Sequence, residues 1–321
     1  MAFSAPRRFA RLVAVAALAA GVTVAPALAQ SDLPIVVGGL PNDSSGTVFY
    51  AADMGFFEKA GLKNVKLTYG EIPGSAAAAI AGGSITIGGL PVSGAAIARE
   101  KGLPLVMIAP SGLYVSANPT AGIIVPKNSP YHKAADLNGK TIATRDISNL
   151  SYFAARLWMD KNGGDSSTVH WVEINDLADV AALQAGRIDA ASISEPALDA
   201  ALRSGEVRSL APVFDALGSR WLIGAYYTSE AFAAAHPDIV RKFSDAVLAT
   251  ANWANKNHAL SAQILEKYAK APIAPDSTRV TYAGTLRASD VQPVLDMLSH
   301  YGMLKTPVRA KDLFAPAIQA Q

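Results

Sequence analysis

Residues 137–152 read LNGKTIATRDISNLSY, a stretch that joins a turn, a short strand and the start of a helix. Asn138-Gly139 is a turn dipeptide, and Thr141–Thr144 has the β-branched composition of a buried strand. The residues that follow are types that cap helix N-termini, namely Ser148, Asn149 and Ser151. A helix that starts just past a strand points free backbone N–H groups at the end of a sheet, where they attract anions or other acceptors. Most loops of this kind bind nothing, so the stretch alone leaves a plain structural role open.

Strand and helix patterns alternate on both sides of this stretch, which predicts an α/β protein with parallel, doubly wound sheets. The length of 321 residues favours two domains or two lobes. An Ala-rich helix that ends on Gly and leads into an Ile-containing strand occurs twice, at 80–87 and 183–190. This repeat supports two lobes of one design, although helix–Gly–strand connections are also common in unrelated proteins. The predicted strands are Ile35–Val37, Val65–Tyr69, Ile85–Ile87, Leu105–Ala109, Ile123–Val125, Thr141–Thr144, Val169–Glu173, Ala190–Ser194, Val207–Val213 and Trp221–Tyr227.

The first 29 residues are predicted to be a cleavable export signal, with three arginines, an apolar segment over Leu12–Val24 and the small-x-small site Ala27-Leu28-Ala29. Removing three arginines leaves 25 basic against 26 acidic residues, a net charge of −1 in place of the +2 of the whole chain. This balance argues against a nucleic-acid partner. We therefore expect a soluble protein of the bacterial periplasm.

The chain contains no cysteine, which excludes disulfides, thiolate metal sites and a cysteine nucleophile. The five histidines are scattered, with no metal-ligand spacing, so we expect no metal. No Ser-His-Asp pattern and no phosphate-binding Gly loop occurs, so we expect no cofactor and no enzymatic activity.

Three segments carry a resemblance to a known family: Phe49–Leu62 (FYAADMGFFEKAGL), Leu137–Ala143 (LNGKTIA) and Ala182–Ala190 (ALQAGRIDA) with the following Glu195-Pro196. In this order, behind an export signal, they resemble the nitrate/sulfonate/taurine and thiamine-precursor group of substrate-binding proteins of bacterial ABC importers, a periplasmic binding protein of the type II fold. The resemblance covers essentially the whole mature chain. Thr86 departs from it, because the family often has Asp there, and we interpret that change as structural.

The resemblance implies two doubly wound α/β lobes joined by two hinge strands, with a ligand cleft between them that closes by hinge motion. We place the crossings near Ser116–Ala121 and Pro212–Trp221, so lobe 1 comprises 30–116 plus 217–321 and lobe 2 comprises 117–216. It also implies that a permease in the inner membrane reads the closed form. We expect the protein itself to be a monomer.

The cleft should be lined by the loops after the strands of both lobes. The predicted ligand-binding residues from the first lobe are Asn42, Ser45, Gly74, Ser75, Pro91 and Ser93, and those from the second are Arg145, Ser148, Asn149, Ser151, Tyr152 and Glu195. Aromatic residues near the crossings complete the set: Tyr114, Trp221 and Tyr226.

Several of these residues have a competing structural role. Ser75 is equally consistent with a plain helix cap. Arg145 is the one cation of these loops, and it either clamps a sulfonate or carboxylate or pairs with a neighbouring acid. Glu195 either accepts from a ligand amine or hydroxyl or is a helix-start carboxylate.

The main functional hypothesis is capture of a small organic anion, a sulfonate or a carboxylate, including aromatic ones. The alternatives are a neutral heterocycle such as a thiamine-precursor pyrimidine, or an enzyme on the same fold. The thiamine-pyrimidine enzyme of this fold needs a Cys-rich motif that is absent here. A sensor subunit that presents the liganded cleft to a membrane kinase is a third possibility that the sequence does not separate from transport.

Overall fold

The computed structural model describes residues 1–2, 33–69, 75–147, 149–270, 272–273 and 277–319. Nearly all of the predicted export signal, together with Gly74 and Ser148, lies outside the described residues. No helix in the described part of the chain combines the length and the apolar character needed to span a bilayer.

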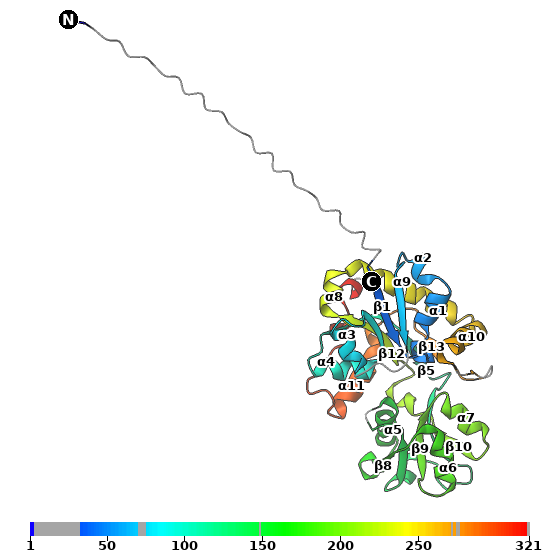
Figure 1. Ribbon diagram of the computed structural model, residues 1–321. Coiled ribbons are helices and arrows are strands. Elements are labelled where there is room, and N and C mark those ends of the chain that lie inside the picture. The colour runs from blue at the N-terminus through cyan, green and yellow to red at the C-terminus, as the bar shows by residue number, and fades with distance from the viewer. Residues whose placement is uncertain (3–32, 70–74, 148, 271, 274–276, 320–321) are drawn as a thin grey trace. The chain divides into compact units, whose positions relative to one another are not determined.

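The first sheet has the strand order β2-β1-β3-β12-β4 (Figure 1). Its strands are β1 (Ile35–Gly39), β2 (Val65–Tyr69), β3 (Ile87–Pro91), β4 (Leu105–Pro110) and β12 (Gly224–Ser229). β1 runs parallel to β2 and β3, whereas β12 runs antiparallel to β3 and β4. The expected parallel pairing holds for β1 with β2 and β3, whereas β12 enters this sheet late in the chain, from the opposite end, and pairs antiparallel.

Helices cover both faces of this sheet, and the alternation of side chains along β4 shows why. Val106 and Ile108 pack into one core with Phe49 and Phe243, which belong to α1 (Thr47–Asp53) and α9 (Pro237–Ala254). Met107 points the other way, as the period of two along a strand requires. That second face is covered by α3 (Ala76–Ala81), α4 (Val92–Glu100) and α11 (Ala288–His300).

The second sheet has the order β10-β6-β9-β7-β8. Its strands are β6 (Ala121–Pro126), β7 (Thr141–Thr144), β8 (His170–Glu173), β9 (Ala190–Ser194) and β10 (Val207–Ala211). β7 is parallel to β8 and β9, and β6 is antiparallel to β9 and β10. α5 (Leu150–Lys161) covers one face, while α6 (Asp179–Gln184) and α7 (Ala197–Arg203) cover the other.

The chain passes between the two sheets twice, at 116–120 and at 212–219, within the two segments where the crossings were placed. The crossings leave and enter through a small sheet of β11 (Arg220–Leu222), β5 (Gly112–Val115) and β13 (Thr281–Tyr282). Ser116 N donates to Ser219 O at 3.0 Å, so the crossings touch each other. The exact boundaries of the two lobes remain a prediction.

The remaining elements are mostly short. The helices are α2 (Phe56–Lys59), α8 (Glu230–Ala235), α10 (His258–Ala269) and α12 (Pro316–Gln319), and the 3-10 turns are η2 (Asp43–Ser45), η3 (Ala134–Leu137), η4 (Ser166–Thr168), η5 (Asp176–Ala178), η6 (Val213–Leu217) and η7 (Ala310–Leu313).

Several strands differ from their predicted bounds, and two of the differences have an explanation in the hydrogen bonds. β3 begins at Ile87 and runs to Pro91, because Thr86 is occupied with β1: its Oγ1 accepts from Val36 N at 3.1 Å. This bond supports the structural interpretation of the Thr86 departure. The predicted strand Trp221–Tyr227 is two strands, β11 and β12, since Ile223 between them donates its N–H to Gly112 O.

Candidate functional site

The loop after β1, residues 42–46, is held from several sides. Asn42 Oδ1 accepts from Ser45 N at 3.1 Å. The carbonyl of Ser44 accepts from Ser111 Oγ at 2.6 Å, and the carbonyl of Ser45 accepts from Tyr226 OH at 2.9 Å. Gly112 lies so close that a Cβ there would stand 3.0 Å from Ser44 Cα. These contacts fix the loop in one conformation.

Asp43 in this loop forms an ion pair with Arg279, whose Nε stands 2.6 Å and 2.7 Å from the two carboxylate oxygens. Arg279 also donates to Tyr50 OH at 3.0 Å, and Tyr50 OH lies 3.0 Å from Tyr282 OH. Burial raises the pKa of Asp43, and the Arg279 charge opposes that rise. The guanidinium is thus committed to the loop rather than presented to a ligand.

The free groups of this loop are hydrogen-bond donors. No partner for the backbone N–H groups of Asp43 and Ser44 lies among the described residues. Successive unpaired N–H groups form a concavity that suits an anion. The other predicted residues of this sheet contribute less: Ser75 precedes α3 without a side-chain cap bond, Pro91 precedes α4, and Ser93 is buried in the first turn of α4.

The loop after β7 offers a second group of donors. Asn149 caps α5, because its Oδ1 accepts from Tyr152 N at 2.8 Å. Ser151 is buried, and its carbonyl accepts from Ser192 Oγ at 3.0 Å. In the described chain the N–H groups of Leu150 and Ser151 have no partner. The start of a 12-residue helix with free N–H groups favours an acceptor or an anion.

Tyr152 stands on the same helix, half-buried. Its ring meets that of Trp171 edge-on at 4.9 Å, and its hydroxyl accepts from Arg156 Nη1 at 3.3 Å. The ring is therefore fixed by its neighbours.

Arg145 pairs with Asp176 at 2.6 Å, so the acid-pairing alternative is the one seen here. The Arg145 side chain is 61% exposed, whereas that of Asp176 is only 4% exposed. Asp179 lies beside this pair, fully buried, and neither of its carboxylate oxygens has a hydrogen-bond partner in the described structure. Burial raises the pKa of Asp179 to about 7, the Asp176 charge adds to the rise, and Arg145 opposes it.

Glu195 directly follows β9, and its backbone N–H donates to Thr120 O at 3.0 Å. Its Oε2 accepts from Asp199 N in the first turn of α7 at 3.2 Å, so Glu195 does act as a carboxylate at a helix start. Burial raises the pKa of Glu195 to about 7; the charges of Asp199 and Asp43 add to this, while Arg203 opposes it. The effect of Asp43 places the end of β9 within electrostatic range of the loop after β1.

The three predicted aromatic residues are interior supports. Tyr114, Trp221 and Tyr226 are fully buried, and each polar group has a protein partner. Trp221 Nε1 donates to Phe214 O, and Tyr114 OH donates to Asp215 Oδ1. Burial raises the pKa of Tyr114 and of Tyr226, so both stay neutral. They hold the crossings and the loop after β1 instead of offering groups to solvent.

Sequence reasoning missed three members of this site: Asp43, Ser111 and Arg279. Ser111 carried a usable signal, since it follows a strand and precedes Gly112 as in other loops of the set. Arg279 carried none, because it is 236 residues from its partner.

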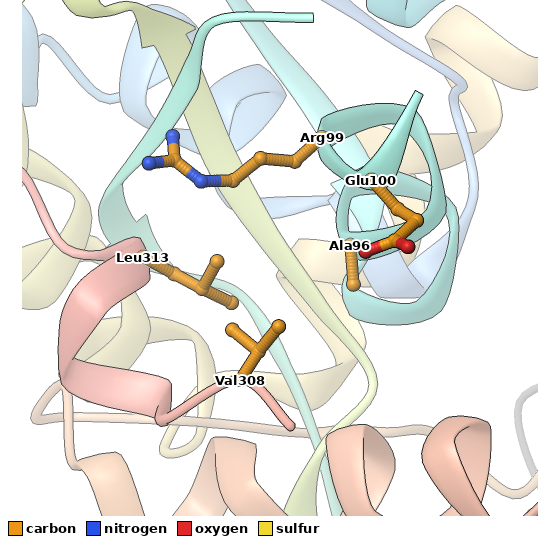
Figure 2. A pocket seen from close by; sticks show the side chains of 5 residues that line it. All are labelled: Ala96, Arg99, Glu100, Val308 and Leu313. Atoms are coloured by element: carbon orange, nitrogen blue, oxygen red, sulfur yellow. The ribbon is translucent and has the colours of Figure 1, made fainter. Parts of the chain in front are cut away.

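Two hollows lie away from these loops. One, of about 180 Å³, is lined by Ala96, Arg99, Glu100, Val308 and Leu313. Figure 2 shows the ends of Val308 and Leu313 close together there. The Arg99 guanidinium is already paired with Glu230 at 2.6 Å. The other, of about 490 Å³, borders the second crossing and the end of α5. Neither is lined by a predicted ligand residue.

The described side chains include no group of three or more His, Asp or Glu placed to hold a metal. The arrangement instead suits recognition of an acceptor: two loops of N–H groups, short hydroxyls, and arginines already neutralised by carboxylates.

Comparison with known proteins gives a consistent picture. The family model described as "NMT1/THI5 like" matches residues 42–259. The taurine-binding periplasmic protein of Escherichia coli (strain K12) is 30% identical over 173 residues, 53% of this chain and 51% of that protein. The chain thus matches about half the length of this curated relative.

Solved structures share the fold over nearly all of the chain. The periplasmic aliphatic sulphonate binding protein SsuA from Escherichia coli has a TM-score of 0.71 at 20% identity, over 90% of this chain and 99% of its own. The desulfurization enzyme DSZB has a TM-score of 0.67 at 14% identity, over 89% and 98%. The predicted two-lobe α/β fold is confirmed, and both a binding protein and an enzyme use it.

Proposed function

Because the chain belongs to the NMT1/THI5-like family, we propose that it is a periplasmic substrate-binding protein of an ABC importer that captures a small organic anion. A sulfonate or a carboxylate is the expected class. The names of the taurine-binding relative and of the sulphonate-binding neighbour support this class. The ligand lies in the cleft between the two lobes, which close on it by hinge motion.

One observation carries the proposal. Each sheet ends in a loop with two backbone N–H groups that have no partner among the described residues, those of Asp43 and Ser44 in one and those of Leu150 and Ser151 in the other. N–H dipoles stabilise a negative charge without an unpaired cation. The arginines nearby, Arg279 and Arg145, are each bound to an aspartate.

The expected export signal at 1–29 supports a periplasmic location, and the permease partner follows from the importer role. We place the chain with the binding proteins rather than the enzymes. The absence of cysteine and of a Ser-His-Asp pattern supports this placement. Turnover of any candidate by the purified protein would reverse it.

The direct test is thermal unfolding of the chain from Gln30 onward with a panel of ethanesulfonate, taurine, aromatic sulfonates, carboxylates, nitrate and a pyrimidine. A ligand at one hundred times its Kd adds about 2.7 kcal/mol of stability, which raises the Tm of a chain this size by roughly 5 °C or more. A stabilising sulfonate or carboxylate supports the proposal. A folded protein that none of the anions stabilises contradicts it, and stabilisation by the pyrimidine alone favours the neutral heterocycle.

A further inference from the structure

Glu195 has one carboxylate oxygen in use and one available. Oε2 accepts from Asp199 N at 3.2 Å, whereas no described group bonds to Oε1. The side chain is half-buried at the end of β9, on the edge of the second sheet where the loop after β7 also lies. A free oxygen at the end of a central strand is in position to meet whatever the cleft holds.

The charges around Glu195 are mostly negative or already paired. Asp199 accepts from Arg203 at 2.7 Å and from Thr278 N at 3.0 Å. Asp43, from the other sheet, is paired with Arg279. Arg203 lowers the pKa of Glu195, but less than burial raises it, and the result is a pKa of about 7. Glu195 is therefore easily protonated near neutral pH.

We propose that Glu195 binds the anion as a neutral acid, donating a hydrogen bond from Oε1, so that at alkaline pH the protein takes up one proton with each anion. This inference rests on the proposed function and specifies the chemistry of that same site. A sulfonate offers only acceptors. An ionised Glu195 side chain also has only acceptors and would repel the sulfonate. A protonated Glu195 side chain supplies a donor from which the sulfonate can accept.

The consequence is an affinity that falls as the pH rises. A sulfonate stays ionised throughout the neutral range, so the pH dependence belongs to the protein. If only the protonated form binds and the free group titrates near 7, the affinity is constant below about pH 6. Above pH 7 it falls tenfold per unit, and the total change from pH 6 to pH 8.5 is about 30-fold.

Asp179, whose pKa burial also raises to about 7, lies beside Arg145 near the loop after β7 and must be separated from Glu195. Glu195→Gln leaves Asp179 in place. Its amide keeps an oxygen for Asp199 N–H and offers a donor at every pH, so it imitates the protonated acid.

The test measures the Kd of ethanesulfonate by calorimetry at pH 6, 7 and 8.5 in the wild-type protein, in Glu195→Gln and in Glu206→Gln. Glu206 is an exposed control just before β10. The wild type and Glu206→Gln are expected to lose about 30-fold in affinity between pH 6 and pH 8.5. Glu195→Gln is expected to stay near the low-pH affinity throughout. It therefore binds more tightly than wild type at pH 8.5, a gain that misfolding cannot produce.

Proton uptake gives a second readout on the wild type alone. Binding heats at pH 8 in two buffers of different ionisation enthalpy should show uptake of close to one proton. A pH-independent Kd, or uptake of no proton, overturns the inference and leaves the proposed function standing. An affinity that rises with pH, for ethanesulfonate or taurine, also overturns it, because an ionised Glu195 would then be favoured. Binding of no anion in the panel at any of these pH values rejects the proposed function itself.

Discussion

The loops after β1 and after β7 use the same parts but differ in how firmly they are held. Each has an Asn that accepts from a backbone N–H three residues on, an Arg–Asp pair, and two N–H groups for which the described part of the chain offers no partner. In the first loop the arginine is 9% exposed and in the second it is 61% exposed. The first loop is thus a fixed half of the site, and the second is an outer half with fewer constraints.

The first loop is also bonded from more of the fold. Residues of β12, of the segment before β5 and of the segment before β13 all reach it, through Tyr226, Ser111 and Arg279. Among the described residues, the second loop is held by its own helix cap, by Ser192 and by Glu173, whose Oε1 accepts from Ile147 N. A site with one fixed and one adjustable half can present pre-organised donors and still close on its ligand.

The largest expected difference between the two loops is the loss of unfolding free energy when the arginine of each Arg–Asp pair is removed. Arg279→Ala leaves Asp43 partly buried without its cation and breaks the bond to Tyr50, so we expect a loss of about 3 kcal/mol in unfolding free energy. Arg145→Ala removes a mostly exposed cation, whose attraction solvent screens, but it leaves the buried Asp176 without that cation, so we expect about 2 kcal/mol. Urea unfolding at pH 7 measures both. Equal losses would show that the two loops are held alike.

A second prediction uses the buried acid beside the second loop. The pKa of Asp179 is raised from 3.8 to about 7 in the fold, so the folded state binds the proton more tightly than the unfolded state. Its contribution to stability is therefore present at low pH and is lost as the pH rises towards 7. We expect this group to remove about 2 kcal/mol between pH 5 and pH 8.

Asp179→Asn should abolish that part of the slope, measured as urea unfolding free energy at pH 5, 6, 7 and 8. Glu206→Gln, at an exposed position just before β10, is the matched control and should keep the wild-type slope. If Asp179→Asn retains the full pH dependence of the unfolding free energy, Asp179 is not the cause of that dependence.

The two loops also show which features of the fold and of the site can be predicted from the sequence and which cannot. The strands β2 and β7 follow from local patterns, because β-branched runs and turn residues act over a few positions. The Asn149 cap was predicted for the same reason. The two crossings were placed from the family resemblance. The role of Arg279 could not be predicted from local patterns, since it depends on a contact across 236 residues. The aromatic residues were predicted near the crossings, but whether Trp221 faces a ligand or the core depends on packing, and here it is buried.

The smallest expected effect separates the two Asn residues, and it tests the comparison most directly. Asn149→Ala removes the cap of α5, which costs about 1 kcal/mol. It also frees the N–H groups of Leu150 and Ser151 to move, so the affinity for the anion should fall by roughly tenfold. Asn42→Ala removes one exposed bond from a loop that Ser111, Tyr226 and Arg279 still hold.

For Asn42→Ala we therefore expect a loss of stability below about 0.5 kcal/mol and an affinity within about threefold of wild type. Asn149→Ser, which keeps a capping oxygen, should recover most of both losses at that position. Kd by calorimetry and urea unfolding on the four proteins give the comparison. A larger loss of affinity for Asn42→Ala than for Asn149→Ala would reverse the assignment, because the loop after β1 would then be the half that depends on its own cap.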